Sequence, residues 1–227
     1  MLTMCPLSPY LVPVRPITAA VQNPMLQASP STESCQSAQT PEEAARLVDV
    51  YTLLAQLMRY PEESATAEAM VEAQLELAGA LGWQRAAEEV RQWRQQCPDL
   101  LHDLRLEYTR LFITAAARRS TVPPYASVYL DSDALLQGRA TERIHDFYRS
   151  CGYELVTQSE PADHVCLQLD FLAALAGEGR EAEEEQFLRT FFRPWFVIFK
   201  EKCFQVTAHP VYRLTLTLID FFTKEEQ

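Results

Sequence analysis

Residues Glu160–Gly177 read EPADHVCLQLDFLAALAG, in which an acidic pair and a histidine precede a long apolar pattern. Leu167, Phe171, Leu172 and Leu175 recur at the three- and four-residue spacing that places side chains on one face of an α-helix. We therefore expect a helix in this segment, and further helices wherever the same spacing recurs.

The polar residues at the start of this segment predict where its helix begins. Proline is favoured at the first helical position, so Pro161 would make Asp163 the third helical residue, where a carboxylate interacts with free backbone N–H groups. Gly177 and Gly179 mark the end of the helix. A carboxylate next to His164 also suggests a functional site, although starting the helix would by itself explain Asp163.

The composition favours a single all-α domain. The chain has 227 residues, 48% of them hydrophobic, which is enough for one substantial core, and only 6 are glycine. Leucine and alanine dominate the C-terminal part and β-branched alternation is rare, which favours helices over sheets. The formal net charge of -11 argues against nucleic acid as a partner, because such binders neutralise phosphates with lysine and arginine.

The cysteines are scattered and form no Cys-x-x-Cys pair. This pattern, in a chain large enough to bury a core, favours free and mostly buried thiols in a reducing compartment over disulfides or a metal site. The six residues are Cys5, Cys35, Cys97, Cys151, Cys166 and Cys203.

Residues 1–40 differ from the rest of the chain. They are rich in Pro, Ser, Thr and Gln, carry one basic residue, Arg15, and show no helical period. Prolines interrupt their apolar stretches, so we expect no secretory signal, and no run in the chain approaches the roughly 18 apolar residues of a membrane span. We predict an irregular N-terminal arm over residues 1–40 and an all-helical domain over residues 41–227, in a cytoplasmic protein without stable membrane insertion.

Capping and helix-breaking residues divide residues 41–227 into roughly nine or ten helices, with no credible strand. Thr40-Pro41-Glu42-Glu43 has the signature of a capping box and begins the first helix, and Asp99 begins a later one. Other boundaries are expected at Pro61, Gly82, Pro98, Arg139, Gly152, Pro194 and Pro210.

Catalytic templates are missing from the sequence. There is no His-Glu-x-x-His, Gly-x-Ser-x-Gly or phosphate-binding glycine loop, and the four histidines lack ligand spacing, so we expect neither a metal nor a cofactor. A hydrolase or transferase that uses Asp163 and His164 as an acid–base pair is disfavoured, because adjacent residues on a helix point about 100° apart. A binding protein is therefore expected rather than an enzyme.

Several motifs occur in a characteristic order. They are Tyr108-x-x-Leu111-Phe112, Pro123-Pro124-Tyr125-x-Ser127-x-Tyr129, Glu160-Pro161-x-Asp163-His164 and Pro194-Trp195-Phe196, followed by His209-Pro210-x-Tyr212-Arg213. Each motif alone is weak, but together they resemble the TorD/DmsD family of redox-enzyme maturation chaperones, which includes the NarJ-like branch. The resemblance extends from Pro41 to about Phe222, and the turn Thr114–Arg119 departs from it in replacing a frequent Gly-Pro.

The resemblance implies an all-helical, non-enzymatic, cytoplasmic chaperone. Such a protein binds the leader peptide and the apo form of a molybdopterin-type oxidoreductase subunit, and holds back export through the twin-arginine pathway until the cofactor is inserted. The oligomeric state, monomer or homodimer, stays open. Carried over by motif, the peptide-binding residues are Tyr108, Leu111, Phe112, Pro124, Tyr125, Asp163 and His164, with Glu160 and Tyr129 as secondary candidates.

The expected roles follow from the chemistry of a twin-arginine leader, which has a basic start and an apolar stretch. The aromatic and leucine side chains of the first two motifs would form a groove for the apolar stretch. Asp163, with Glu160, would accept hydrogen bonds from leader arginines, while His164 would tune the charge near neutral pH or only position Asp163. The alternatives are a NarJ-like assembly chaperone for a non-exported redox enzyme, or a helical scaffold or ligand sensor without leader binding.

Overall fold

The computed structural model describes residues 10–13, 41–113, 121–131, 138–156 and 160–224, and most of them are helical. The all-α prediction is thereby confirmed. The helical segments are α1 (Pro41–Leu57), α2 (Ser64–Ala80), α3 (Gln84–Gln96), α4 (Leu100–Tyr108), η1 (Thr109–Ile113), α5 (Ser127–Leu130), α6 (Arg139–Ser150), α7 (Val165–Gly177), α8 (Glu181–Phe187), η2 (Leu188–Phe192), α9 (Arg193–Val206) and α10 (Pro210–Phe222).

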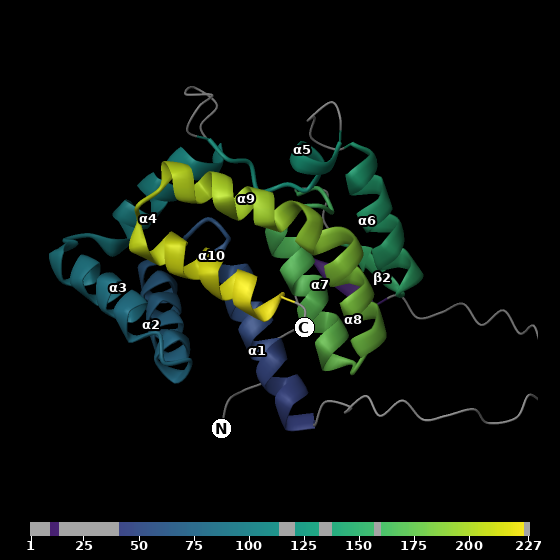
Figure 1. Cartoon of the computed structure of the whole chain (residues 1–227), viewed down its shortest axis with the longest axis horizontal. Helices are drawn as coiled ribbons and strands as arrows, with labels where there is room; N and C mark the ends of the chain where they lie inside the picture. Colours follow the sequence, from purple (N-terminus) through teal and green to yellow (C-terminus); the bar gives the residue numbers. More distant parts are fainter. Residues whose placement is uncertain (1–9, 14–40, 114–120, 132–137, 157–159, 225–227) are drawn as a thin grey trace, which may run out of the picture.

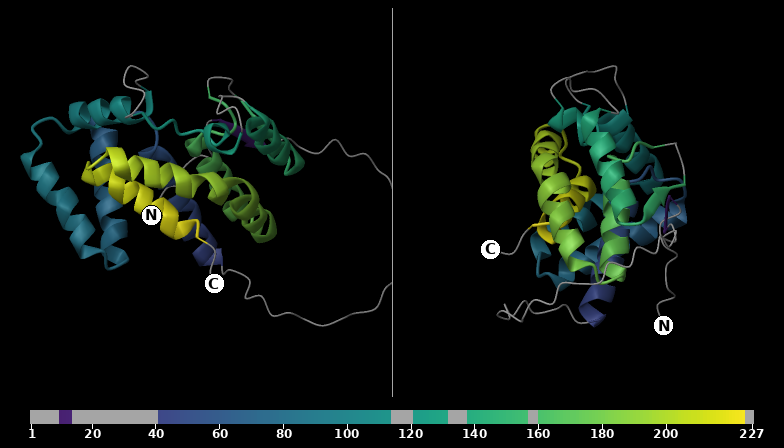
Figure 2. Two further views of the ribbon diagram at one scale, coloured as in Figure 1. Left: turned by 45° about the horizontal axis from the view of Figure 1, so that its top comes forward. Right: turned by 90° about the vertical axis from the view of Figure 1, so that its right-hand side faces the viewer.

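Helices α1 and α7 pack along each other and link the two sides of the molecule (Figure 1). Helices α2 and α3 lie on one side and α6 on the other, while α9 and α10 pass across the face that Figure 1 presents. The turned views in Figure 2 show the same arrangement, with α9 and α10 outside the central helices. Elements from both ends of the chain therefore meet around α1 and α7.

The central position of α7 follows from its composition. Every residue from Val165 to Ala176 is buried, because the helix is apolar around almost its whole circumference and is covered on all sides. On α1 the burial is one-sided, and the fully buried residues Leu54 and Ala55 face the core. The apolar spacing that predicted these helices thus also indicated which of them could be central.

Several predicted helix boundaries are confirmed. The side chain of Asp99 accepts a hydrogen bond from the backbone N–H of His102 at 3.0 Å and so caps α4. Gly152 and Gly179 follow α6 and α7 with φ of 82° and 67°, the left-handed conformation that favours glycine after a helix. The predicted Thr40 cap lies outside the described residues.

The start predicted for α7 is wrong. The helix begins at Val165 and His164 is its N-cap, so Pro161 is not the first helical residue and Asp163 is not the third. The reason is long-range, because the backbone around His164 is held extended by an antiparallel bridge to Tyr125. A local capping pattern carries no information about that partner.

The prediction that the chain contains no strand is also wrong. Strands β1 (Leu11–Pro13) and β2 (Tyr153–Leu155) form a small antiparallel sheet in which Leu11 is opposite Leu155. Three-residue strands are too short to show an alternating pattern, and these two lie far apart in the sequence. Residues 10–13 of the predicted arm therefore pack on the helical domain.

Five-residue π-helical turns occur in two places of the described chain. Segment η1 continues α4, and η2 joins α8 to α9 just before Pro194. Proline lacks a backbone donor and crowds the preceding turn, which gives a physical reason for widened helix geometry before it. Four aromatic residues around Pro194 are fully buried, and Phe191 is partly buried against the same core; the four are Phe192, Trp195, Phe196 and Phe199.

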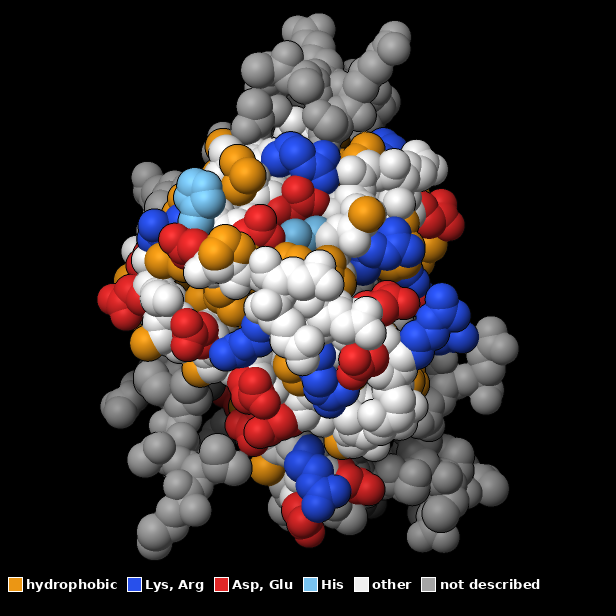
Figure 3. Space-filling model, turned by 90° about the vertical axis from the view of Figure 1, so that its left-hand side faces the viewer, with side chains coloured by type: hydrophobic (Ala, Val, Ile, Leu, Met, Phe, Trp, Pro, Cys, Tyr) orange, Lys and Arg blue, Asp and Glu red, His pale blue; other side chains and the backbone are white. Residues whose placement is uncertain are grey.

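The exposed surface carries mixed charges. Figure 3 shows basic and acidic side chains interspersed on the face that carries α2 and α3. The exposed pair Arg85–Glu89 and the pair of the half-buried Arg94 with Glu72 lie there, with nitrogen–oxygen distances of 3.3 and 3.7 Å. Within the residues that the structure describes, no helix is long and apolar enough to cross a membrane.

The glycine after α7 provides a test of this backbone geometry. Gly179→Ala is expected to lower the free energy of unfolding by about 1–2 kcal/mol, because its positive φ is unfavourable for a residue with a Cβ. Gly79→Ala is the matched control, because a Cβ added at this position in α2 meets nothing within 4 Å. This control is expected to raise the free energy of unfolding by about 0.5–1 kcal/mol. Urea denaturation measures both variants, and equal changes in their free energy of unfolding would contradict the left-handed conformation of Gly179.

Candidate functional site

The proline-rich loop of the second motif lies against the start of α7. The backbone N–H of Ala126 donates to the carbonyl of Asp163 at 3.1 Å, and that of Val165 donates to the carbonyl of Pro124 at 2.9 Å. Adjacent prolines hold the loop extended, so it can pair with the extended segment that precedes the first residue of α7. Two motifs about forty residues apart are thereby joined through their backbones.

Asp163 fastens this junction through its side chain. It is fully buried, and its Oδ2 accepts the backbone N–H of Ser127 at 2.8 Å while its Oδ1 accepts the hydroxyl of Thr141 at 2.9 Å. A carboxylate is tolerated in a protein interior only when its oxygens are satisfied in this way. Asp163 therefore ties α5, α6 and the start of α7 together.

The fourth motif supports the same junction from the other side. Gln168 donates its amide N–H to the carbonyl of Asp163 at 2.7 Å, and the indole N–H of Trp195 donates to Oε1 of Gln168 at 3.2 Å. The hydroxyl of Tyr148 donates to the carbonyl of Ala162 at 3.0 Å. All of these groups are buried, so the polar network is internal.

His164 is held as a neutral imidazole. Burial, with a smaller effect from the positive charge of Arg59, lowers the pKa of His164 to about 3. Its Nδ1 accepts the backbone N–H of Cys166 at 3.2 Å, which places the proton of the neutral ring on Nε2. The expectation that His164 tunes the charge of the site near neutral pH is therefore wrong.

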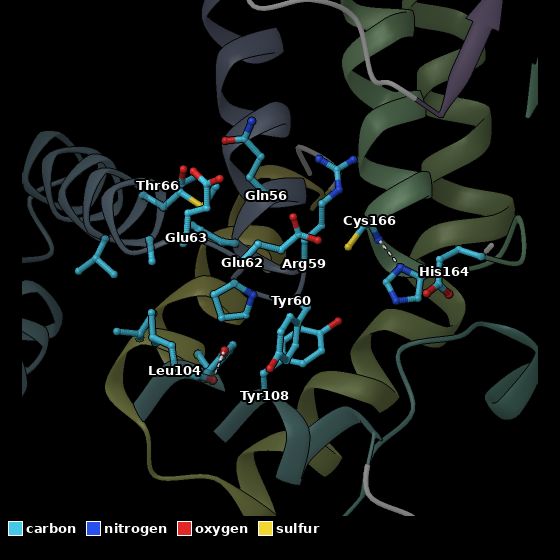
Figure 4. A pocket seen from close by; sticks show the side chains of 18 of the residues that line it. Gln56, Arg59, Tyr60, Glu62, Glu63, Thr66, Leu104, Tyr108, His164 and Cys166 are labelled. Atoms are coloured by element: carbon cyan, nitrogen blue, oxygen red, sulfur yellow. Dashed lines mark hydrogen bonds between the residues drawn. The ribbon is translucent and has the colours of Figure 1, made fainter. Parts of the chain in front are cut away.

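A pocket of about 440 Å³ lies next to His164 (Figure 4). It is bounded by the end of α1 and the following loop, the first turns of α2, and parts of α4, α7 and α10. Its apolar wall includes Leu57, Met70, Val71, Leu104, Tyr108 and Val211. Apolar walls with a few polar groups are typical of ligand pockets.

Three carboxylates are among the polar groups of the pocket. Glu62 and Glu63 are exposed at its edge, and Glu160 lies near His164. The Tyr125 hydroxyl donates to Oε2 of Glu160 at 2.8 Å, and within the described residues Oε1 makes no hydrogen bond. Burial, together with this bond, raises the pKa of Tyr125 and keeps its hydroxyl protonated. The pocket thus combines an apolar wall with carboxylates that can meet a cation.

Arg59 is the basic group of the pocket, and it is already paired. Its guanidinium forms an ion pair with the buried Asp170. Arg105, which is outside the pocket, holds the edge in place by donating from Nε to the carbonyl of Pro61 at 2.8 Å and from its terminal nitrogen to the carbonyl of Glu62. Arg105 therefore holds the backbone of the acidic edge in place, while the carboxylates of Glu62 and Glu63 stay exposed.

The structure separates the predicted site residues into groups. Tyr108, Glu160 and His164 line the pocket, and Tyr125 contacts two of them, since its ring lies 4.9 Å from that of His164. The remaining predicted residues lie in the core or in the loop junction. They are Leu111 and Phe112, both buried, Pro124, whose carbonyl accepts from Val165, Tyr129, which stacks on Trp195, and Asp163.

The single groove expected from the aromatic motifs is thus divided, because Leu111 and Phe112 face the core while Tyr108 reaches the pocket. Sequence reasoning also missed the loop that forms the edge, Arg59 to Glu63. In this loop only Pro61 was interpreted, as a helix boundary, and the acidic pair that follows it was not singled out. The departing turn at Thr114–Arg119 lies outside the described residues.

The internal role of Asp163 predicts a large effect on stability. Asp163→Ala is expected to lower the free energy of unfolding by about 2–4 kcal/mol, because the buried N–H of Ser127 and the partly buried hydroxyl of Thr141 lose their acceptor. Asp146→Ala removes an exposed carboxylate from α6 and is expected to stay within about 0.5 kcal/mol of wild type. Urea denaturation measures both. If Asp163→Ala is not stable enough to purify, Thr141→Val tests the same network with an expected loss of about 1 kcal/mol.

The neutral state of His164 predicts a pH dependence of stability. Its pKa is about 3 in the folded chain and about 6.5 when unfolded, so the unfolded state binds more protons between these values. This contribution is present above pH 6.5 and is lost as the pH falls, with a slope of up to about 1.4 kcal/mol per pH unit. His164→Asn keeps an acceptor for the Cys166 N–H and should flatten the slope, whereas His102→Asn at an exposed position should not. If the free energy of unfolding changes with pH in the same way in wild type and in both variants, His164 is not the neutral, buried group described above.

Comparisons with known proteins agree with this architecture. A family model described as the nitrate reductase delta subunit matches residues 78–201, which is more than half of the chain. A solved structure of a candidate redox enzyme maturation protein from Archaeoglobus fulgidus aligns with a TM-score of 0.54 and 25% identity, covering 78% of this chain and 94% of that one.

Two curated relatives are named chaperones. Chaperone protein TorD of Vibrio cholerae is 28% identical over 145 residues, which are 59% of this chain and 64% of the relative. Tat proofreading chaperone DmsD of Salmonella typhi is 36% identical over 107 residues, which are 47% of this chain and 52% of the relative. The matched parts are thus less than two thirds of these proteins, and they confirm the predicted relationship to the TorD/DmsD group. The chain belongs to the nitrate reductase delta subunit family.

Proposed function

We propose that this protein is a non-enzymatic, cytoplasmic chaperone that binds the leader peptide of a molybdopterin-type oxidoreductase subunit and keeps the apo subunit from export until its cofactor is inserted. What supports the proposal is the acid-edged, apolar-walled pocket, in a chain whose relatives include the maturation chaperones TorD and DmsD. A leader with basic residues before an apolar stretch matches both kinds of wall.

The pocket residues have distinct roles in this proposal. Glu62, Glu63 and the open oxygen of Glu160 accept hydrogen bonds from the arginines, and Tyr108 contacts the apolar stretch. His164 and Tyr125 form the end of the pocket beside Glu160. Asp163 supports the site from within, and so do Pro124, Leu111, Phe112 and Tyr129, because their contacts hold the walls in place.

A second candidate function is assembly of a redox enzyme that is not exported, with an N-terminal client segment lacking paired arginines. The description of the matching family model, the nitrate reductase delta subunit, favours this candidate. Both candidates use the same pocket, and they differ in the charge of the ligand. A labelled peptide with two adjacent arginines before an apolar stretch, compared with the same peptide carrying alanines instead, separates them by fluorescence anisotropy.

The acidic edge gives the sharpest test. Glu62→Gln with Glu63→Gln is expected to weaken binding of the arginine peptide by about two- to tenfold and to reduce its salt dependence, because two partly exposed charge pairs are lost. Glu88→Gln with Glu89→Gln on α3 makes the same change in net charge outside the pocket and should leave binding near wild type.

Equal losses in both double variants would mean that only the net charge attracts the peptide. Absence of binding to either peptide by the wild-type protein, and also by a variant in which the pocket residue Tyr10 is replaced by alanine, would overturn leader binding. Affinity purification from the native cell then identifies the bound polypeptide. An oxidoreductase subunit is expected for a chaperone, and a different client is expected for a scaffold or sensor.

A further inference from the structure

The pocket contains a residue from the chain's own N-terminal region. Tyr10 is among its lining residues, although the other walls come from residues 56–71, 104–108, 160–167 and 211–212. The backbone carbonyl of Tyr10 accepts the N–H of Val156 at 2.9 Å, and Leu11–Pro13 continue as strand β1 along β2. A short extended segment is therefore added to a strand edge, and its residue Tyr10 lines the pocket.

The side chains of this segment show how it is held. The ring of Tyr10 lies beneath the guanidinium of Arg59, with 5.1 Å between the guanidinium carbon and the ring centroid. Leu11 is 3% exposed and anchors the segment, whereas Val12 is 44% exposed. An aromatic side chain in the pocket, combined with backbone hydrogen bonds to a strand edge, is a typical way in which an extended peptide is bound.

The chemistry of the surrounding sequence matches the acidic edge of the pocket. Residues 1–32 contain one basic residue, Arg15, and no aspartate or glutamate. The segment thus belongs to an apolar, weakly cationic stretch, while Glu62, Glu63 and Glu160 line the pocket that it reaches. In charge and hydrophobicity it resembles the class of ligand proposed above.

The attachment of the segment includes two contacts that are weak individually. A three-residue, two-stranded pair is only marginally stable, and the cation–π contact of a partly exposed arginine contributes little. A ligand that makes more contacts with the same surface can replace it.

We propose that Tyr10–Pro13 is an internal competitor for the ligand site, and that an extended client segment takes its place by adding to the edge of β2 and putting an apolar side chain against Arg59. The proposal rests on the proposed function, and it extends the binding site from the pocket to strand β2. The client is therefore recognised by its backbone as well as by its charges.

Removal of the Tyr10 ring from the full-length protein tests this competition. Tyr10→Ala is expected to tighten binding of the arginine peptide by about two- to fivefold, because the internal segment loses its contact with Arg59. Val12→Ala is the matched control, since it removes an exposed side chain from the same strand outside the pocket, and should leave the affinity unchanged.

A reversible cross-link provides a second test. Val12 is directly opposite Glu154, so Val12→Cys with Glu154→Cys places two thiols within reach of a disulfide. Oxidation should abolish peptide binding by locking the strand, and reduction of the same sample should restore it. The single Glu154→Cys variant, oxidised in the same way, controls for pairing with a native cysteine and for loss of the Arg149 contact.

The outcomes separate this proposal from the proposed function. Peptide binding by wild type that is unchanged or weakened in Tyr10→Ala, and unaffected by the cross-link, overturns the competition and leaves leader binding standing. Binding that is absent in wild type and present in Tyr10→Ala supports it. Binding that is absent in wild type, in Tyr10→Ala and in the reduced double variant overturns both.

Discussion

A buried carboxylate, that of Asp163, holds together segments that are remote in sequence. Its oxygens accept from Ser127 at the start of α5 and from Thr141 in α6, and its own backbone carbonyl accepts from Ala126 and Gln168. Because an unsatisfied carboxylate in the interior is strongly unfavourable, these segments are not free to separate one at a time. The positions of His164 and Glu160, which flank Asp163, are fixed as a consequence.

The helices could largely be predicted from local signals. Asp99 as a cap and Gly152 and Gly179 as helix ends act within one turn of their own position, so the sequence around them is sufficient. The start of α7 could not be predicted, because pairing with the Pro124–Ala126 loop overrides a favourable proline position. The β1–β2 pair could not be predicted for the same reason, since each strand is stabilised by a partner far away in the chain.

The candidate site was predictable only in part. The motifs identified Tyr108, Glu160 and His164, all of which line the pocket, but a motif does not distinguish side chains that contact a ligand from those that build its walls. Leu111 and Phe112 belong to the second kind, because both face the aromatic core. The acidic edge at Glu62 and Glu63 carried no motif, and its place in the same pocket as Glu160 depends on how α1 and α2 pack.

The pocket has walls from almost the entire length of the chain, from Tyr10 through α1, α2, α4 and α7 to Tyr212 in α10. Its contacts are therefore of long sequence separation, and forming them requires the closure of long loops. A growing polypeptide that has not yet produced α10 lacks one side of the pocket. Ligand affinity is thus a property of the finished molecule, and a bound ligand stabilises the whole fold at once rather than any single helix.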